Sequence, residues 1–197
     1  MLWNLILVLI GSYVMGCFVA AYYVTRLRRG VDIRASGSGN AGARNMARVY
    51  GLTDAVITLL IDAAKGAAAV VAGLMIVGPE WAGAAALLAA IVGHIWPVQL
   101  SFHGGKGAAT GLGGILALDL GVALALLAAG AMWFAFTRNF FRSGLVAIGL
   151  AAPMLWIFGH APSTVVVVGV TSLLCLVVHH PVLDAPRQPR TGQATLD

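Results

Sequence analysis

Two polar, glycine-rich segments interrupt this chain: Ser36-Gly37-Ser38-Gly39-Asn40-Ala41-Gly42-Ala43-Arg44-Asn45 and Phe102-His103-Gly104-Gly105-Lys106-Gly107. Each segment lies between long apolar runs. Glycine allows consecutive backbone N–H groups to turn toward one anion, and Lys106 and the nearby arginines add positive charge. Polar loops are costly in so apolar a chain, so we expect them to form a site for a phosphorylated substrate of lipid character.

The composition around these loops is that of a membrane protein. The 197 residues are 60% hydrophobic and 10% charged, with a mean hydropathy of +0.92, whereas a soluble domain carries about 25% charged residues. Long unbroken apolar runs predict helices, because a β-barrel would show segments of about ten residues with alternating polarity. We therefore expect one all-α, polytopic helix bundle over residues 1–183 and a polar, flexible tail at 184–197.

Seven apolar segments are predicted to form transmembrane helices. Their ranges are Leu2–Leu27, Asp54–Val77, Trp81–Leu100, Gly107–Leu118, Leu120–Phe136, Gly144–Phe158 and Thr164–Val178. Among the connections between them, lysine and arginine occur only in alternate ones and in the tail. The positive-inside rule then places the amino terminus outside and the carboxyl terminus in the cytoplasm, so both glycine-rich loops face the cytoplasm.

Neither loop matches a known nucleotide-binding motif in the required context. Residues 37–42 fit GxGxxG, but no strand precedes them and no βαβ pattern surrounds them. Residues 104–107 are not a Walker A motif, since Gly107 stands where Ser or Thr would hold magnesium. The interpretation that remains is that each loop is a glycine turn leading into a helix. Backbone N–H groups at such a turn favour an anion, and Arg34, Arg48 and Lys106 are available to bind it.

The sequence indicates neither a covalent nucleophile nor a cofactor. Cys17 and Cys175 are isolated within apolar runs, so they form no metal-ligand spacing and no disulfide framework. No metal, cofactor or nucleic acid is therefore expected as a partner. If the protein is an enzyme, we expect it to bind and position reactive substrates rather than form a covalent intermediate.

Three polar residues within the spans allow two interpretations each. Asp62 and Lys65 are three residues apart and can pair on one helix face, either to fix the helix position or to support the site. His94 lies near the second glycine loop and is either a general base for a hydroxyl acceptor or a hydrogen-bonded core histidine. His160 is expected on the outer face, away from the site.

These residues resemble the bacterial acyl-phosphate-dependent glycerol-3-phosphate acyltransferases over about residues 10 to 146. The resemblance rests on residues 37–43 (GSGNAGA) and residues 102–110 (FHGGKGAAT), with Asp62, Lys65 and His94 between them. It implies seven spans and a cytoplasmic site in a bacterial inner membrane. The implied reaction transfers a fatty acyl group from acyl-phosphate to the sn-1 hydroxyl of glycerol-3-phosphate and yields lysophosphatidic acid.

The resemblance also implies roles for individual residues. The second loop should hold a phosphate, with Thr110 capping the helix that follows, and the first loop should orient the second phosphate and the acceptor. The candidate catalytic residues are Ser38, Lys106 and His94. The candidate substrate-binding residues are Arg34, Gly37, Gly39, Asn40, Arg44, Asn45, Arg48, Gly104, Gly105, Gly107, Thr110, Ser143 and His180. A soluble enzyme that produces acyl-phosphate is a candidate partner, together with the two substrates and the lipid bilayer.

Some positions depart from the family pattern. Arg44 stands where the family usually has threonine, Phe141 replaces a usual tyrosine, and Val146 replaces a second serine after Ser143. In the carboxyl-terminal motif, His180 matches a histidine but Leu183 occupies an asparagine position. Two alternatives therefore stay open: the same fold acylating another acceptor, and a non-catalytic anion or lipid transporter.

Overall fold

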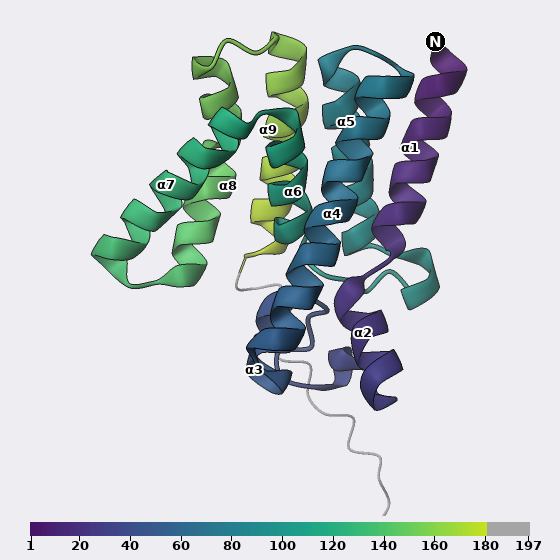
Figure 1. The fold of residues 1–197 in the computed structure, drawn as a ribbon, viewed down its shortest axis with the longest axis vertical. Helices are drawn as coiled ribbons and strands as arrows, with labels where there is room; N and C mark the ends of the chain where they lie inside the picture. Colours follow the sequence, from purple (N-terminus) through teal and green to yellow (C-terminus); the bar gives the residue numbers. More distant parts are fainter. Residues whose placement is uncertain (181–197) are drawn as a thin grey trace, which may run out of the picture.

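The computed structural model describes residues 1–180 and contains helices and no strand within that range (Figure 1). The α-helices are α1 (Leu2–Cys17), α2 (Ala20–Arg29), α3 (Ala43–Tyr50), α4 (Leu52–Ile76), α5 (Glu80–Ile95), α6 (Ala108–Leu118), α7 (Leu120–Thr137), α8 (Phe140–Ile157) and α9 (Pro162–Val178). Two short 3₁₀-helices cover Ile33–Ala35 and Val98–Leu100. The all-α prediction is thus confirmed for the described part of the chain, and the predicted tail at 184–197 lies outside it.

Four helical segments are long and apolar enough to cross a membrane: α4, Glu80–Leu100, α7 and α8. The pair α1 and α2 makes a fifth if the two helices count as one bent span. Helices α6 and α9 have 11 and 17 residues, fewer than the roughly 20 residues of a straight span. Among residues 1–180 the structure therefore supports a helical membrane protein with four or five candidate spans.

The prediction of one continuous first helix over Leu2–Leu27 was wrong. Helix α1 ends at Cys17, α2 begins at Ala20, and the two are bent by 40°. A side chain of α4 bonds the backbone groups freed by this break: Lys65 Nζ donates to the carbonyl oxygens of Gly16 (3.2 Å) and Phe18 (2.8 Å). Apolar surroundings supply no water for such carbonyls, so the buried lysine stabilises the break by satisfying them.

Other boundaries differ in smaller ways. The first polar connection contains helix α3, which was not predicted, and α8 begins at Phe140 rather than at Gly144. The side chain of Asn139 explains the earlier start, because its Oδ1 accepts from the backbone N–H of Arg142 and caps the helix.

Helix α4 is the centre of the bundle and packs against α1, α3, α5 and α6. Its contact with α6 is close because glycine lies on both sides. A Cβ at Gly66 would overlap the carbonyl oxygen of Thr110, and a Cβ at Gly113 would overlap that of Ala63. Such small residues allow helix backbones to approach closely in lipid. Helices α7 and α8 lie on the side of the bundle opposite α1, and their lower ends in Figure 1 diverge from α4.

Polar residues of three connections meet at the end of the bundle where the amino terminus lies (Figure 1). His160 Nδ1 lies 2.6 Å from Glu80 Oε1, and its Nε2 lies 3.2 Å from Asp119 Oδ2. Thr164 Oγ1 also donates to Glu80 Oε2 at 3.0 Å. The connections that carry the two glycine-rich loops are at the other end, so His160 is remote from them, as predicted.

Candidate functional site

The first glycine-rich loop is shaped by Asn45, which lies beneath it on α3. Asn45 Oδ1 accepts from the backbone N–H of Ser38 (2.9 Å), and its Nδ2 donates to the carbonyl of Ser36 (2.9 Å). Gly37 and Gly39 have φ of 60° and 74°, a region that favours glycine. Asn45 was predicted to bind substrate; the structure instead places its amide, 1% exposed, against the loop backbone. The hydroxyl-bearing residue Ser38 is exposed on the loop.

The second loop folds back onto the end of α5. The backbone N–H of Gly104 donates to the carbonyl of Ile95, and that of Gly105 donates to the carbonyl of His94, both at 3.0 Å. Gly107, with φ of 79°, then forms the N-cap of α6. A Cβ added to Gly105 would overlap His94 Nε2 and lie 2.8 Å from the carbonyl oxygen of Ala41 in the first loop. The two glycine-rich loops are therefore in direct contact at one end of the bundle.

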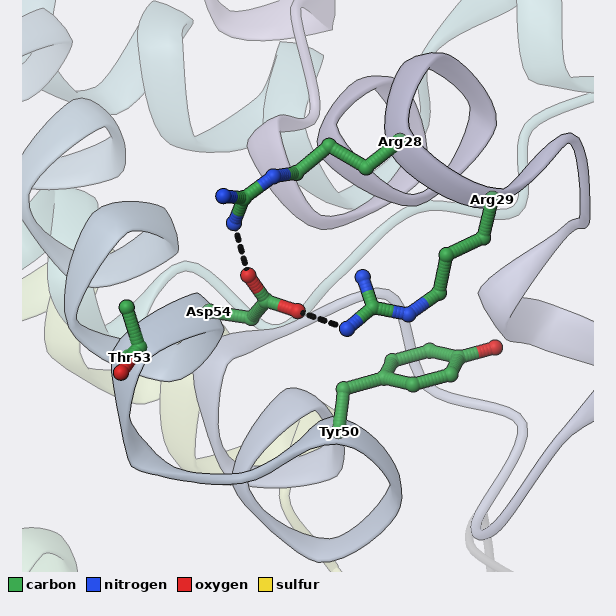
Figure 2. Close-up of a pocket in the computed structure, with 5 residues that line it drawn as sticks. All are labelled: Arg28, Arg29, Tyr50, Thr53 and Asp54. Atoms are coloured by element: carbon green, nitrogen blue, oxygen red, sulfur yellow. Dashed lines mark hydrogen bonds and ion pairs between the residues drawn. The ribbon is translucent and has the colours of Figure 1, made fainter.

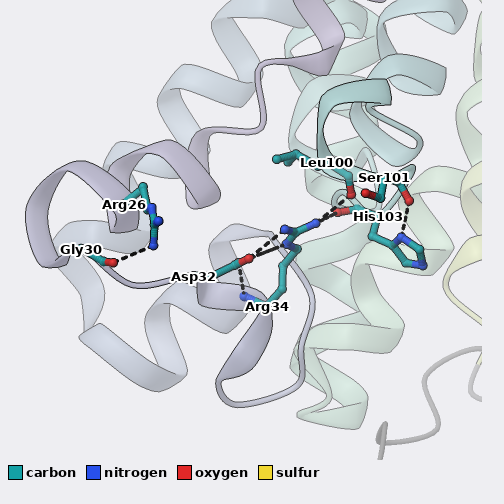
Figure 3. Close-up of polar contacts among 7 residues, drawn as sticks. All are labelled: Arg26, Gly30, Asp32, Arg34, Leu100, Ser101 and His103. Carbon is teal, nitrogen blue, oxygen red and sulfur yellow. Dashed lines mark hydrogen bonds and ion pairs between the residues drawn. The ribbon is translucent and has the colours of Figure 1, made fainter. Parts of the chain in front are cut away.

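Arg34 ties the first loop to the segment that precedes the second (Figure 3). Its Nε and Nη2 donate to the carboxylate of Asp32 at 2.7–3.0 Å, and its Nη1 donates to the carbonyls of Leu100 (2.8 Å) and His103 (3.2 Å). Partial burial raises the pKa of Asp32, but the hydrogen bonds and charge of Arg34 outweigh it and hold that pKa below its usual value. Arg34 was predicted to bind substrate. In the structure each of its three side-chain nitrogens donates a hydrogen bond to another group of the protein.

Replacing Arg34 by Gln should loosen the junction between the two loops. The variant loses the ion pair with Asp32 and two charge-assisted bonds to backbone carbonyls, each such bond contributing about 1.5–3 kcal/mol when desolvated. Because Arg34 is partly exposed, we expect about a tenfold fall in kcat/KM, measured on the purified protein. Arg138→Gln, at an exposed position on the α7–α8 connection, is the matched control, and an equal fall in both variants would contradict the assigned role.

A buried polar network lies directly behind the second loop. Lys65 Nζ is 2.8 Å from Asp62 Oδ1 and 2.7 Å from His94 Nδ1, and all three side chains are buried. The predicted Asp62–Lys65 pair is thus present. His94 meets Lys65 through one ring nitrogen and packs its other nitrogen behind Gly105. This arrangement matches the hydrogen-bonded core histidine rather than a ring presented at the loop surface. The link from Lys65 to the α1–α2 break was not predictable, because the break itself has no signal in the sequence.

The expectation that Thr110 caps α6 was wrong. Gly107 is the N-cap and provides no side chain, while Thr110 is the third residue inside the helix. Within residues 1–180, no side chain caps the first turn of α6. Thr110 is fully buried, and its Oγ1 has no hydrogen-bond partner among the described residues.

The same end of the bundle also gathers residues from α3, α8 and α9. The guanidinium of Arg44 lies 4.8 Å from the centre of the Phe141 ring, which in turn lies 6.0 Å from the ring of His179. Ser143 Oγ donates to the carbonyl of Asn139 (2.9 Å) and is buried. Sequence reasoning selected His180, which is exposed, and missed the contact that its neighbour His179 makes with α8.

The remaining predicted residues lie on or beside the loop surfaces. Arg44 and Arg48 lie on α3 and are exposed, and Lys106 and Asn40 are partly exposed. Arg44 and Arg48 thus lie on the helix that follows the first loop, and Lys106 lies in the second loop, which contacts the first. Cationic side chains at these positions can bind phosphate groups, whereas the backbone N–H groups of Ser38, Gly39, Gly104 and Gly105 are bonded within the protein.

Comparison with known proteins identifies close relatives. A family model described as glycerol-3-phosphate acyltransferase matches residues 6–185. The glycerol-3-phosphate acyltransferase 1 of Bacillus cereus is 40% identical over 174 residues, covering 88% of this chain and 95% of the relative. The glycerol-3-phosphate acyltransferase of a Synechococcus species is 36% identical over 191 residues, covering 95% and 94% of the two chains.

Solved structures agree with these sequence relatives. The crystal structure of PlsY, described as an integral membrane glycerol 3-phosphate acyltransferase in its glycerol 3-phosphate form, superposes with a TM-score of 0.85. It is 28% identical, and the match covers 91% of this chain and 90% of that one. The lysophosphatidic acid form of the same protein gives a TM-score of 0.83.

The helical membrane fold and the paired glycine loops, together with these matches, define the class as an integral membrane acyltransferase. Within that class, the chain belongs to the glycerol-3-phosphate acyltransferase family.

Proposed function

We propose that this protein transfers a fatty acyl group from acyl-phosphate to the sn-1 hydroxyl of glycerol-3-phosphate and forms lysophosphatidic acid. The observation that carries the proposal is the contact between the two glycine-rich loops around Gly105 and Ala41, which gives one place for two phosphorylated substrates. The substrate named for the relatives, glycerol 3-phosphate, fits this cationic and glycine-rich surface.

The proposed setting is a bacterial inner membrane, with seven transmembrane helices, the amino terminus outside and the site facing the cytoplasm. The charge distribution supports this orientation. The end of the bundle with the glycine loops carries Arg26, Arg28, Arg29, Arg34, Arg44, Arg48, Lys106, Arg138 and Arg142. The opposite end carries Glu80 and Asp119 with His160. This asymmetry follows the positive-inside rule. A soluble enzyme that makes acyl-phosphate would deliver its product from the cytoplasmic side.

The reaction needs no covalent enzyme intermediate, because acyl-phosphate is already an activated mixed anhydride. The acceptor hydroxyl oxygen attacks the acyl carbonyl carbon, and the bond from that carbon to the phosphate oxygen breaks. Inorganic phosphate leaves, and a phosphate oxygen takes up the hydroxyl proton. The contribution of the protein is then to hold the two substrates in a reactive geometry and to stabilise negative charge.

The geometry suggests how these tasks are divided. Lys106 would hold one phosphate at the N-terminus of α6, while the N–H groups of Gly104 and Gly105 donate to carbonyls of α5. Ser38, Arg44 and Arg48 would orient the other substrate from the first loop and α3. Lys106 and Ser38 are thus proposed to touch substrate. His94 is proposed as a positioning residue, since it lies buried behind Gly105.

Lys106→Ala tests the proposal. Loss of a charge-assisted phosphate contact should reduce kcat/KM by about 100-fold, measured as lysophosphatidic acid formed by purified protein from acyl-phosphate and glycerol-3-phosphate. Arg138→Gln should keep wild-type activity.

Three results would count against the proposal. Normal turnover by Lys106→Ala would remove Lys106 from the site. Acylation of other acceptors without glycerol-3-phosphate would indicate a different acceptor. Anion or lipid transport across proteoliposomes, with no acyl transfer, would indicate a transporter.

A further inference from the structure

A polar cavity outside the proposed active site opens between the end of α2 and the start of α4 (Figure 2). It is a surface depression that is largely open to solvent, has a volume of about 520 Å³ and is lined by Arg28, Arg29, Tyr50, Thr53 and Asp54. No residue of this cavity belongs to the proposed catalytic or substrate-binding set. Two arginines at one cavity call for an explanation beyond membrane orientation, since orientation requires only charge and no particular geometry.

A single buried carboxylate holds both arginines in place. Asp54 forms ion pairs with Arg28 and with Arg29, the latter at 2.7 Å from Oδ2 to Nη2. The guanidinium of Arg29 also lies 4.3 Å from the centre of the Tyr50 ring. The side chain of Asp54 is 4% exposed, whereas those of Arg28 and Arg29 are 51% and 35% exposed. The three side chains therefore carry a net charge of +1 on two prepositioned guanidinium groups.

The two guanidinium groups have more N–H donors than Asp54 can accept, so some donors can bind a ligand. Each has five N–H groups, and the two oxygens of Asp54 cannot accept from all of them. Figure 2 shows the two groups on either side of the carboxylate, coming from neighbouring positions at the end of α2. An anion in the cavity could accept hydrogen bonds from both, in the forked geometry that arginine offers to phosphate oxygens.

The surroundings indicate that this anion belongs to a lipid. Leu27 and Leu52, next to the arginines and to Thr53 in the chain, are 84% and 75% exposed. In an integral membrane protein, apolar side chains exposed to this degree are expected to contact acyl chains. The cavity is thus placed where acyl chains give way to headgroups, the level at which arginine meets anionic lipid.

We propose that the cavity of Arg28, Arg29, Tyr50, Thr53 and Asp54 binds the phosphate headgroup of an anionic membrane lipid. A phosphomonoester headgroup is preferred over a phosphodiester, because it presents three terminal oxygens to two arginine forks and carries more charge. The inference rests on the cavity and not on the proposed reaction, so each can fail without the other.

Binding of defined lipids tests the proposal. The full chain is placed in phosphatidylcholine nanodiscs that contain a small fraction of phosphatidic acid, and lipid retention is measured by native mass spectrometry after release. Wild-type protein should retain phosphatidic acid in preference to phosphatidylcholine and phosphatidylglycerol. The double variant Arg28→Gln/Arg29→Gln should retain about tenfold less phosphatidic acid, since it loses charge-assisted hydrogen bonds. Arg138→Gln, which removes one exposed charge elsewhere, should retain the wild-type amount.

Two further variants separate lipid binding from folding. The triple variant Arg28→Gln/Arg29→Gln/Asp54→Asn leaves no unpaired buried charge and should fold yet still bind about tenfold less. Arg28→Lys/Arg29→Lys keeps the charges without the forked geometry and should lose about threefold. Two outcomes would overturn the proposal: no preference for phosphatidic acid in wild-type protein, or equal losses in the double variant and in Arg138→Gln. Equal retention of phosphatidylglycerol would overturn the preference for a monoester.

Discussion

Replacing Lys65 by Met should destabilise the protein severely. The variant leaves the carboxylate of Asp62 buried without its cation, which lies 2.8 Å away in the wild type. It also removes the donor to the carbonyls of Gly16 and Phe18 at the α1–α2 break. Breaking a buried ion pair by removing one partner typically costs about 3–5 kcal/mol. The expected result is a strongly lowered Tm in detergent, with little folded protein recovered.

A second substitution at the partner position tests this reasoning. Lys65→Met/Asp62→Leu removes both charges, so it should be more stable than Lys65→Met alone, because no unpaired charge remains. Its activity should stay below wild type, since His94 loses the contact to Lys65 and the break in the first span loses its donor. A double variant no more stable than the single one would contradict the role of the ion pair.

Gly105→Ala should have a large effect on activity with little chemical change. The added Cβ would overlap His94 Nε2 and lie 2.8 Å from the carbonyl oxygen of Ala41. Neither neighbour is the free end of a flexible side chain, so the second loop has to move away from the first. A misplacement of about 1 Å in a reactive geometry can cost about 100-fold in rate. We therefore expect a fall of that order in kcat/KM for lysophosphatidic acid formation.

The matched control is Gly149→Ala within α8. A Cβ there meets only Leu176 Cδ1, at the ordinary contact distance of 3.9 Å, and alanine favours helix over glycine by about 1 kcal/mol. This variant should keep wild-type activity and equal or better stability. Wild-type activity in Gly105→Ala would show that contact between the two loops is not needed for the reaction.

The fold class and the position of the two loops could be predicted from the sequence because both depend on local patterns. Long apolar runs require helices in a membrane, and the alternation of connections that carry lysine or arginine predicts that the two glycine-rich loops lie on one side. The Asp62–Lys65 pair was also predictable, since residues three apart on a helix share a face and unpaired charges within a span are costly.

What the sequence left open depends on contacts between residues far apart in the chain. No local signal marks the break after Cys17, because the break is stabilised by Lys65 from another helix. The role of Asn45 and the ties of Arg34 to Leu100 and His103 likewise need the loops to be folded against each other. An apolar pattern and a charge count therefore determine that the chain is a helical membrane protein with its polar loops at one end. Only the tertiary structure decides which of the polar side chains shape those loops and which remain exposed to meet a substrate, because each buried donor and acceptor must find its partner in three dimensions.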